Sequence, residues 1–382
     1  MITMTKRKIA NPFVYQGYVG PDYFCDRVVE TEQLCSDLQN GRNVTLIAPR
    51  KIGKTGLIKN TFFKLKKENK EALFLYMDIF STRNQHDFVT MFGNAVCESL
   101  MSHGQQLKRR ALQLMGAWRP VFSLDPLTGA PTVSVTIEAS QTSMSLKSIF
   151  DFLGSLKQEV YIAFDEFQQI TIYPEQGTEA LLRSYIQFAP NIHFIFSGSR
   201  MHLMSEMFGS PGRPFFQSTQ FLSLKPLYEE VYYDFARGFF NKRKGELDRD
   251  VFQQLYQRFE GYTWYVQSVL NQLYENTSVV RSVEQLNEAI VMVLAGKEPQ
   301  YETLLQFLTD NQRRLLLAIA HEDVVSQPTG KAFIQKYRLG SASSIRSTME
   351  VLQDRDLIYR TSQGLIVYDR FLSLWLRRTF VL

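Results

Sequence analysis

The sequence predicts an α/β fold whose centre is a parallel sheet covered by helices on both faces. Four apolar runs have the length and composition of buried strands, and helical patterns separate them. Strands that alternate with helices in this way build parallel sheets. The predicted strands are residues 44–47, 72–78, 160–164 and 192–196, and the helical patterns are residues 54–68, 87–101, 145–158 and 177–188.

An insertion interrupts this alternation before the third strand. Residues 122–135 alternate in polarity around an Asp-Pro-Leu-Thr-Gly turn, which predicts a hairpin near residues 121–138.

Two further segments follow the α/β part. Residues 228–295 show apolar residues at helical spacing and no strand pattern, which predicts a small helical domain. The last segment predicts a winged helix-turn-helix, because helical patterns are followed by two short strands joined by a turn. Its helices are expected at 311–320, 330–337 and 342–352 and its strands at 357–360 and 365–368. We therefore expect three domains, over residues 1–226, 227–300 and 301–382.

The composition narrows the class of protein. With 382 residues and 45% hydrophobic content, the chain is large enough for two or three packed domains. The 43 Lys and Arg against 38 Asp and Glu give a net charge of only +5, which does not by itself indicate a nucleic-acid partner. The three cysteines lack C-x-x-C spacing, and no apolar stretch has the length of a signal peptide core or a membrane span. We expect reduced cysteines and a cytoplasmic protein.

A Gly-Lys-Thr lies between the first strand and the first helical pattern, within residues 46–55 (LIAPRKIGKT). This arrangement is typical of a phosphate-binding loop, whose backbone N–H groups surround the β-phosphate of a nucleotide at a helix N-terminus. Gly53 allows close approach of the backbone, Lys54 is expected to reach the β- and γ-phosphates, and the Thr55 hydroxyl is expected to bind Mg²⁺. Ala48 takes the place of the first glycine of the usual pattern and still leaves room for the turn.

The third strand ends in a second motif, Asp165-Glu166. Asp165 is expected to hold Mg²⁺ opposite Thr55, and Glu166 to polarise a water for in-line attack on the γ-phosphate. A solvated surface pair is the alternative for these two carboxylates. Together with the phosphate loop, they favour an NTPase of the additional-strand, catalytic-glutamate type.

The fourth strand ends in Ser197-Gly198-Ser199-Arg200. We expect this strand to lie between the other two, so that Ser199 can sense the γ-phosphate. Arg200 has three open roles: it neutralises charge in the transition state, pairs with a carboxylate of the site, or is structural. Arg50 of the loop can likewise face phosphate, a partner subunit or solvent.

Taken in order, these motifs resemble those of the archaeal-type ATPase family, which belongs to the STAND class of signal-transduction ATPases and is related to the AAA+ proteins. The resemblance covers nearly the whole chain from about Asn11 and rests on five segments: residues 24–27 (FCDR), 48–55 (APRKIGKT), 164–168 (FDEFQ), 196–200 (FSGSR) and 224–227 (LKPL). It implies a P-loop NTPase sheet of order 5-1-4-3-2, a helical lid, ATP with Mg²⁺ as the bound nucleotide, and a switch between ATP- and ADP-bound forms.

The resemblance also implies further residues of the site. The segment like residues 24–27 lies against the nucleotide base in such proteins, so Arg27 is expected at the base or ribose. Members carry a Gly-x-Pro in the lid, which aligns with Gly261-Tyr262-Thr263, where Thr263 replaces the proline. The residues predicted to bind the nucleotide are Arg27, Pro49, Arg50, Lys51, Ile52, Gly53, Lys54, Thr55, Gly56 and Ser199. The predicted catalytic residues are Glu166, Lys54 and Arg200. The predicted Mg²⁺ ligands are Thr55 and Asp165.

The winged helix leaves its partner open. Between Tyr301 and Leu382 there are 11 Lys and Arg against 8 Asp and Glu, an excess of +3, which is modest for a DNA-binding domain. Its second helix offers Ser343, Ser344, Arg346 and Ser347 to a DNA groove, with Lys336 and Arg338 as phosphate contacts. The small excess favours an unknown protein partner, or docking within the chain, over DNA.

The sequence thus predicts an ATP-hydrolysing regulatory switch. Two alternatives are a DNA-binding AAA+-like ATPase of replication, repair or mobile elements, and an ATP-binding interaction module without turnover. Glu166 argues against the second alternative. A nucleotide-dependent oligomer also remains open.

Overall fold

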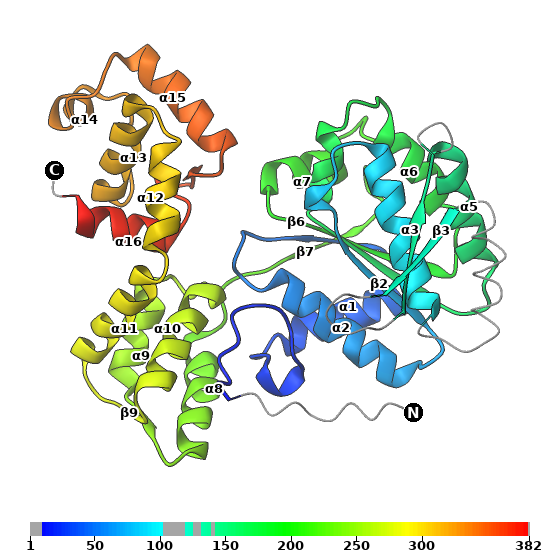
Figure 1. Cartoon of the computed structure of the whole chain (residues 1–382), viewed down its shortest axis with the longest axis horizontal. Coiled ribbons are helices and arrows are strands. Elements are labelled where there is room, and N and C mark those ends of the chain that lie inside the picture. The colour runs from blue at the N-terminus through cyan, green and yellow to red at the C-terminus, as the bar shows by residue number, and fades with distance from the viewer. Residues whose placement is uncertain (1–9, 102–118, 125–130, 139–141, 381–382) are drawn as a thin grey trace. The chain divides into compact units, whose positions relative to one another are not determined.

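The computed structural model describes residues 10–101, 119–124, 131–138 and 142–380 (Figure 1). The chain divides into two compact units. One unit spans Gln16–Leu227, and the other joins the N-terminal segment up to Tyr15 to the chain from Tyr228 onward. No helix among the described residues is long and apolar enough to cross a membrane.

The first unit is built on a five-stranded parallel sheet. Its strands are β1 (Val44–Ile47), β2 (Leu73–Asp78), β5 (Val160–Asp165), β6 (Ile192–Gly198) and β7 (Gln220–Ser223). Their spatial order, β2-β5-β6-β1-β7, is the predicted 5-1-4-3-2 order, and every pairing is parallel. The three central strands are buried along their whole length, which explains their continuous apolar sequences. The sequence pattern does not indicate β7, because Leu222 is its one buried residue.

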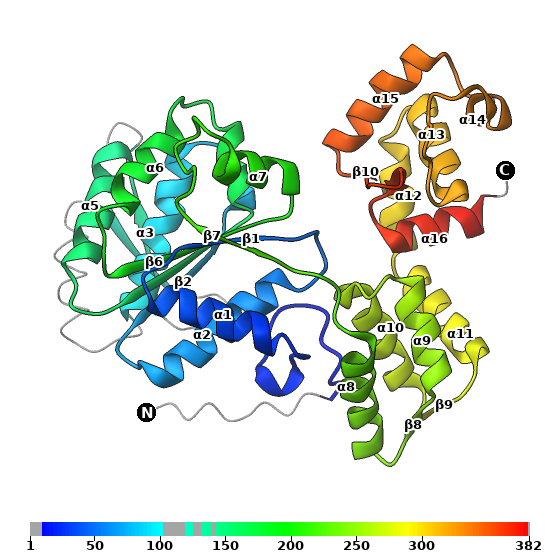
Figure 2. The same cartoon turned by 180° about the vertical axis from the view of Figure 1, so that it is seen from behind.

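Helices cover both faces of this sheet (Figures 1 and 2). Leu34 of α1 (Val28–Gln39) and Leu57 and Ile58 of α2 (Lys54–Glu68) pack on one face. The helices of the other face are α3 (Gln85–Met101), α5 (Thr142–Ser155), α6 (Thr178–Ile186) and α7 (Met201–Gly209).

A hairpin and three short helices are the other elements of this unit among the described residues. At the position of the expected hairpin, β3 (Arg119–Leu124) pairs antiparallel with β4 (Pro131–Thr136). The 3-10 helices are η1 (Pro21–Tyr23), η2 (Ile79–Ser81) and η4 (Phe167–Ile172).

The second unit begins with a helical domain. It contains α8 (Glu229–Lys242), α9 (Arg249–Arg258), α10 (Thr263–Asn276) and α11 (Val283–Ala295), with two short parallel strands, β8 (Glu246–Leu247) and β9 (Val279–Val280). The N-terminal segment is part of its core. Phe13 is fully buried against Phe239, Phe240 and Tyr274, and the Asn271 amide donates to the Phe13 carbonyl at 2.9 Å.

The predicted winged helix follows and is confirmed. It comprises α12 (Glu298–Gln306), α13 (Asp310–Glu322), α14 (Lys331–Lys336), α15 (Ala342–Asp354), β10 (Ile358–Arg360), β11 (Leu365–Val367) and α16 (Arg370–Thr379). Thr309 caps α13 in a capping box with Gln312, and Ser341 caps α15. The prediction did not include α16, although Phe371, Leu372, Trp375 and Leu376 have the spacing of one helix face and are all buried.

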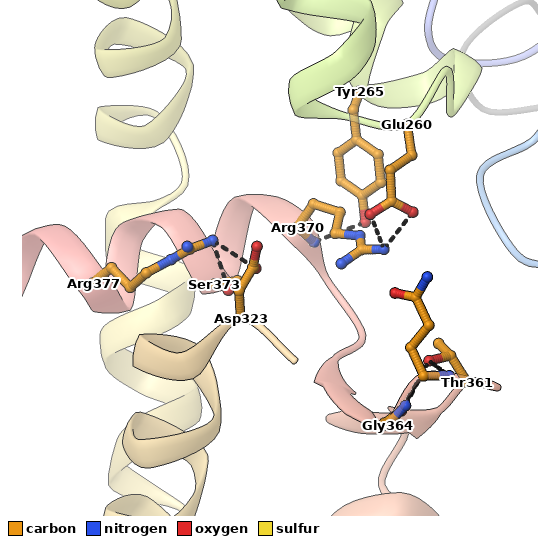
Figure 3. Close-up of polar contacts among 9 residues, drawn as sticks. Glu260, Tyr265, Asp323, Thr361, Gly364, Arg370, Ser373 and Arg377 are labelled. Carbon is orange, nitrogen blue, oxygen red and sulfur yellow. Dashed lines mark hydrogen bonds and ion pairs between the residues drawn. The ribbon is translucent and has the colours of Figure 1, made fainter. Parts of the chain in front are cut away.

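The start of α16 joins the winged helix to the helical domain (Figure 3). The Arg370 guanidinium contacts both carboxylate oxygens of Glu260, at 2.7 and 2.8 Å, and its backbone N–H donates to the Tyr265 hydroxyl at 3.1 Å. The Glu260 side chain is 57% exposed, so water screens this ion pair and its contribution is small. The Phe371 ring lies against Phe259, Trp264 and Tyr265 and supplies the buried part of the joint.

We predict that Tyr265→Phe lowers the free energy of unfolding of this unit by about 1–2 kcal/mol, because a buried N–H at the start of α16 loses its acceptor. Tyr265 is 1% exposed, so water does not readily replace the hydroxyl. Urea denaturation of the full chain measures the change. Tyr262→Phe is the control, since Tyr262 is only partly buried and its hydroxyl makes no hydrogen bond to the described residues. Equal losses in both variants would contradict the role given to this hydrogen bond.

Candidate functional site

The loop between β1 and α2 has the geometry of an anion-binding turn. Lys51 and Gly53 have positive φ angles of 67° and 102°, and this left-handed backbone turns the loop into the start of α2. A positive φ is uncommon for a residue such as Lys51 and is typical of functional loops. Gly53 caps α2 without a side-chain hydrogen bond, and the first turn contains no acidic residue. The N-terminus of α2 therefore keeps its backbone donors and positive dipole end for an anion.

Lys54 is buried inside this loop, with 6% of its surface exposed. Its ammonium donates to the carbonyls of Ala48 at 3.0 Å and Pro49 at 3.1 Å. Burial lowers the pKa of Lys54, and the negative charges of Glu166 and Asp165 act in the opposite direction. The two carboxylates of the second motif therefore lie within electrostatic reach of the loop lysine.

Asp165 links β5 to β2 and to the start of α2 at the carboxyl edge of the sheet. Its Oδ2 accepts hydrogen bonds from the Thr55 hydroxyl at 2.9 Å and the Tyr76 hydroxyl at 2.7 Å. Its Oδ1 accepts from the Glu166 backbone N–H at 3.1 Å. A hydroxyl and a carboxylate side by side are hard oxygen donors of the kind Mg²⁺ prefers, so Thr55 and Asp165 fit the predicted metal pair.

Glu166 is oriented by two donors. Its Oε2 accepts from the Ser199 hydroxyl and from the Gln168 side-chain amide, both at 2.6 Å. The Glu166 backbone has a φ of 55°, which turns the chain out of β5 into η4. The structure therefore brings together Glu166 and Ser199, which the sequence placed at the ends of two neighbouring strands.

Gly198 makes this arrangement possible. A Cβ atom at this position would lie 2.4 Å from Oε1 of Gln168 and 2.5 Å from Cγ of Met204. Both distances are far below van der Waals contact, so a side chain here would require the Gln168 or Met204 side chain to move. The small residue before Ser199 thus supports the orientation of the catalytic candidate.

Other predicted site residues have structural partners. Arg27 is 3% exposed, and its guanidinium contacts Glu30 at 2.7 Å and the Ile52 carbonyl at 3.3 Å, so it supports the loop from within the protein. A Cβ on Gly56 would lie 2.9 Å from the Phe24 ring, which places the segment before Arg27 against the start of α2. The base or ribose contact of Arg27 stays a prediction.

The two remaining arginines lie at the ends of strands. The Arg50 guanidinium lies 5.6 Å from the centre of the Phe80 ring, beyond the end of β2. Arg200 precedes α7, and its carbonyl accepts from the Met204 N–H at 3.1 Å. Their roles toward phosphate stay predictions.

Sequence reasoning missed three polar residues of this edge. Tyr76 and Gln168 contact the predicted carboxylates directly, and Asp78 is the register partner of Asp165 on the neighbouring strand. Burial raises the pKa of Asp78, the Phe80 N–H lowers it, and the nearby charges of Asp165 and Glu166 raise it further. A polar residue at the end of a neighbouring predicted strand was the available signal for Asp78.

The lid element aligned with Gly-x-Pro has a clear local geometry. Gly261 has a φ of 67°, and a Cβ there would meet the Tyr256 ring at 2.6 Å, so glycine is required. Thr263 is the first helical residue of α10, the position at which proline is favoured. Threonine therefore occupies a place that would accept the usual proline, and its contact with nucleotide stays a prediction.

Two segments of the chain match known family models. Residues 36–197 match the KAP family P-loop domain, and residues 299–378 match a probable winged helix domain. No curated protein matches the chain. The chain thus combines a P-loop NTPase domain, a nucleotide-binding fold, with a winged helix domain.

Solved structures of similar fold align with nearly the whole chain. A Walker-type ATPase of Pyrococcus abyssi has a TM-score of 0.64 at 14% identity, over 96% of this chain and 99% of that one. The ORC2 protein of Aeropyrum pernix, solved with ADPNP and ADP, has a TM-score of 0.58 at 15% identity, over 97% and 98%. The ORC1 protein of Aeropyrum pernix, solved with DNA, has a TM-score of 0.55 at 13% identity, over 97% and 96%. At these identities the similarity establishes the fold, and it confirms the predicted resemblance to archaeal ATPases at that level.

We predict that Tyr76→Phe weakens the Mg²⁺-dependent part of ATP affinity by about tenfold, because Asp165 loses the donor that orients its Oδ2. Burial raises the pKa of Tyr76, so its hydroxyl remains a donor at physiological pH. Calorimetric titration of ATP with and without Mg²⁺ separates the two parts of the affinity. Tyr161→Phe is the control, since the Tyr161 hydroxyl on β5 makes no hydrogen bond to the described residues. An unchanged Mg²⁺ dependence in the Tyr76 variant would show that this hydroxyl does not position Asp165.

Proposed function

We propose that this chain binds ATP with Mg²⁺, hydrolyses it slowly, and uses the cycle as a regulatory switch of the STAND and AAA+-like kind. One observation supports this proposal most strongly. Thr55 of α2, Asp165 and Glu166 at the end of β5, and Ser199 directly after β6 meet in two hydrogen-bonded pairs at the carboxyl edge of the sheet. Ligands of open α/β sheets bind at this edge, outside the carboxyl ends of the strands.

The residues divide the work of nucleotide binding. The N-terminus of α2 and the loop N–H groups would hold the β-phosphate, and Lys54 would exchange its two loop carbonyls for phosphate oxygens. Thr55 and Asp165 would hold Mg²⁺, which supplies charge neutralisation at the phosphates when bound. The Tyr76 hydroxyl and the Glu166 N–H keep the Asp165 carboxylate in the required orientation.

Glu166 is the proposed group that orients the attacking water. Ser199 and Gln168 both donate to one oxygen of its carboxylate, which restrains the side chain and would leave the other oxygen to accept from a water. This placement supports hydrolysis over a module that only binds ATP. Arg200 follows Ser199 directly and is the proposed cation for transition-state charge.

The proposal includes the predicted division into an ATPase domain (1–226), a helical lid (227–300) and a winged helix (301–382), with the segment around Phe13 packed on the helical lid. In this division Gly261, Tyr262 and Thr263 form the proposed lid element, and the winged helix is the part that contacts the regulated partner. Whether an oligomer forms with ATP can be measured by light scattering with each nucleotide.

We expect Lys54→Ala to lower ATP affinity by ~10²-fold or more, because it removes the cation that contacts the β- and γ-phosphates. Isothermal titration calorimetry measures the affinity. Lys64→Ala, on the same helix but 41% exposed, is the matched control and should bind like the wild type. Wild-type affinity in the Lys54 variant would refute the phosphate-loop assignment.

Glu166→Gln separates binding from chemistry. We expect ATP to remain bound while hydrolysis slows by ~10²-fold or more, since the amide can keep the Ser199 contact but cannot accept a proton. Phosphate release under single-turnover conditions gives the rate. Glu71→Gln, an exposed acid of the same unit, controls for the loss of one charge. If the Glu166 variant hydrolyses ATP at the wild-type rate, another residue activates the water.

A further inference from the structure

Nine of the 11 basic residues of the winged helix fall into two groups, and the other two, Lys331 and Arg378, are exposed. One group is held by internal partners. Lys336 pairs with Glu322 at 2.5 Å, and Arg377 pairs with Asp323 at 3.0 Å. The other members of this group contact a carboxylate or a backbone carbonyl: Arg313 with Leu305, Arg355 with Phe307 and Arg370 with Glu260. These cations already have partners within the chain.

The second group consists of four exposed arginines, Arg314, Arg338, Arg346 and Arg360. Their guanidinium groups make no hydrogen bond, ion pair or ring contact to any residue that the structure describes. The net excess of +3 therefore does not show where unpaired positive charge lies. Glu322 and Asp323 pair with Lys336 and Arg377, and Asp369 caps α16. The four arginines keep their full capacity to bind an external anion.

These arginines line two grooves beside the N-terminal half of α15. Arg346 and Arg360 line a concavity of about 450 Å³, together with Met349 and the loop 326–330. Arg314 and Arg338 line a smaller groove with Asn311, Gly340, Ser344 and Thr348. Each groove thus combines two guanidinium groups with hydroxyls, amides or backbone groups, which are the donors that bind phosphate.

The side of α15 between the grooves is polar and exposed. Ser343, Ser347 and Glu350 recur at helical spacing and form a ridge, with Arg346 on one side and Ser344 and Thr348 on the other. Figure 1 shows α15 at the outside of the winged helix, on the far side of the domain from α16. A polar helix with arginines along both sides fits a groove whose two walls carry phosphates.

The chemistry of this surface favours nucleic acid over protein. Stable protein interfaces are centred on buried aromatic or large apolar anchors, and the ridge offers serines and one glutamate in that place. The major groove of B-form DNA admits an α-helix, whereas the major groove of A-form RNA is too narrow and deep. We propose that α15 with Arg314, Arg338, Arg346 and Arg360 forms a binding surface for duplex DNA. This inference does not depend on ATP hydrolysis.

Fluorescence anisotropy of a short labelled DNA duplex of mixed sequence, with the full chain, tests the proposal. We expect binding that falls steeply between about 50 and 200 mM salt, since arginine–phosphate contacts release counterions. Arg346→Ala/Arg360→Ala and Arg314→Ala/Arg338→Ala should each reduce the salt dependence by about two units of slope, one for each lost contact. Lys336→Ala/Arg377→Ala removes the same charge from internally paired positions and should leave the slope unchanged.

Four results would overturn the proposal. One is the absence of duplex binding at low salt, and a second is an equal loss in the control and test variants, which would show a general effect of net charge. A third is competition by polyglutamate as strong as by DNA, which would assign the surface to an acidic protein. The fourth is an affinity for duplex RNA equal to that for duplex DNA, which would show that the surface does not select DNA. Lys54→Ala should bind DNA like the wild type, so a failure of the ATPase proposal is seen separately.

Discussion

The Asp165 carboxylate is the constraint on which the proposed site depends. It is 3% exposed, and a buried carboxylate is stable only where hydrogen bonds replace water. Thr55, Tyr76 and the Glu166 N–H provide these bonds from α2, β2 and the end of β5. One side chain thus fixes the start of the phosphate-loop helix, the edge strand and the catalytic candidate relative to one another.

The order of the strands makes this constraint possible. β5 lies between β2 and β6, so Asp165 can reach Tyr76 on one side while Glu166 reaches Ser199 on the other. The register aligns Asp78 with Asp165 across the β2–β5 pair. Gly198 completes the arrangement, because its missing side chain leaves space for the Gln168 amide that holds Glu166.

The residues that sequence reasoning found are those that lie next to each other in the chain. Lys54, Thr55, Asp165 and Glu166 belong to short motifs with a recognisable position after a strand, and the resemblance to archaeal ATPases implied the sheet order that the structure confirms. Tyr76 and Gln168 lack such a motif, and their contacts depend on strand register and backbone turns that no local pattern encodes. For the same reason the net charge of the winged helix does not reveal which of its cations are paired, since the ion pair of Lys336 with Glu322 forms between two helices.

The contacts around Arg370 and Phe371 connect the helical domain to the winged helix within the second unit. Phe371 packs against Phe259, Trp264 and Tyr265 at the start of α10, where Gly261 and Thr263 form the proposed lid element. The same helix, α16, contacts α13 and β11 inside the winged helix. Close-packed aromatic rings transmit displacement because they cannot deform without opening a cavity. A nucleotide-dependent shift of the lid element would therefore move α16, and with it the domain that presents α15, as one piece. In this arrangement the proposed DNA surface needs no nucleotide contact of its own to follow the state of the ATPase.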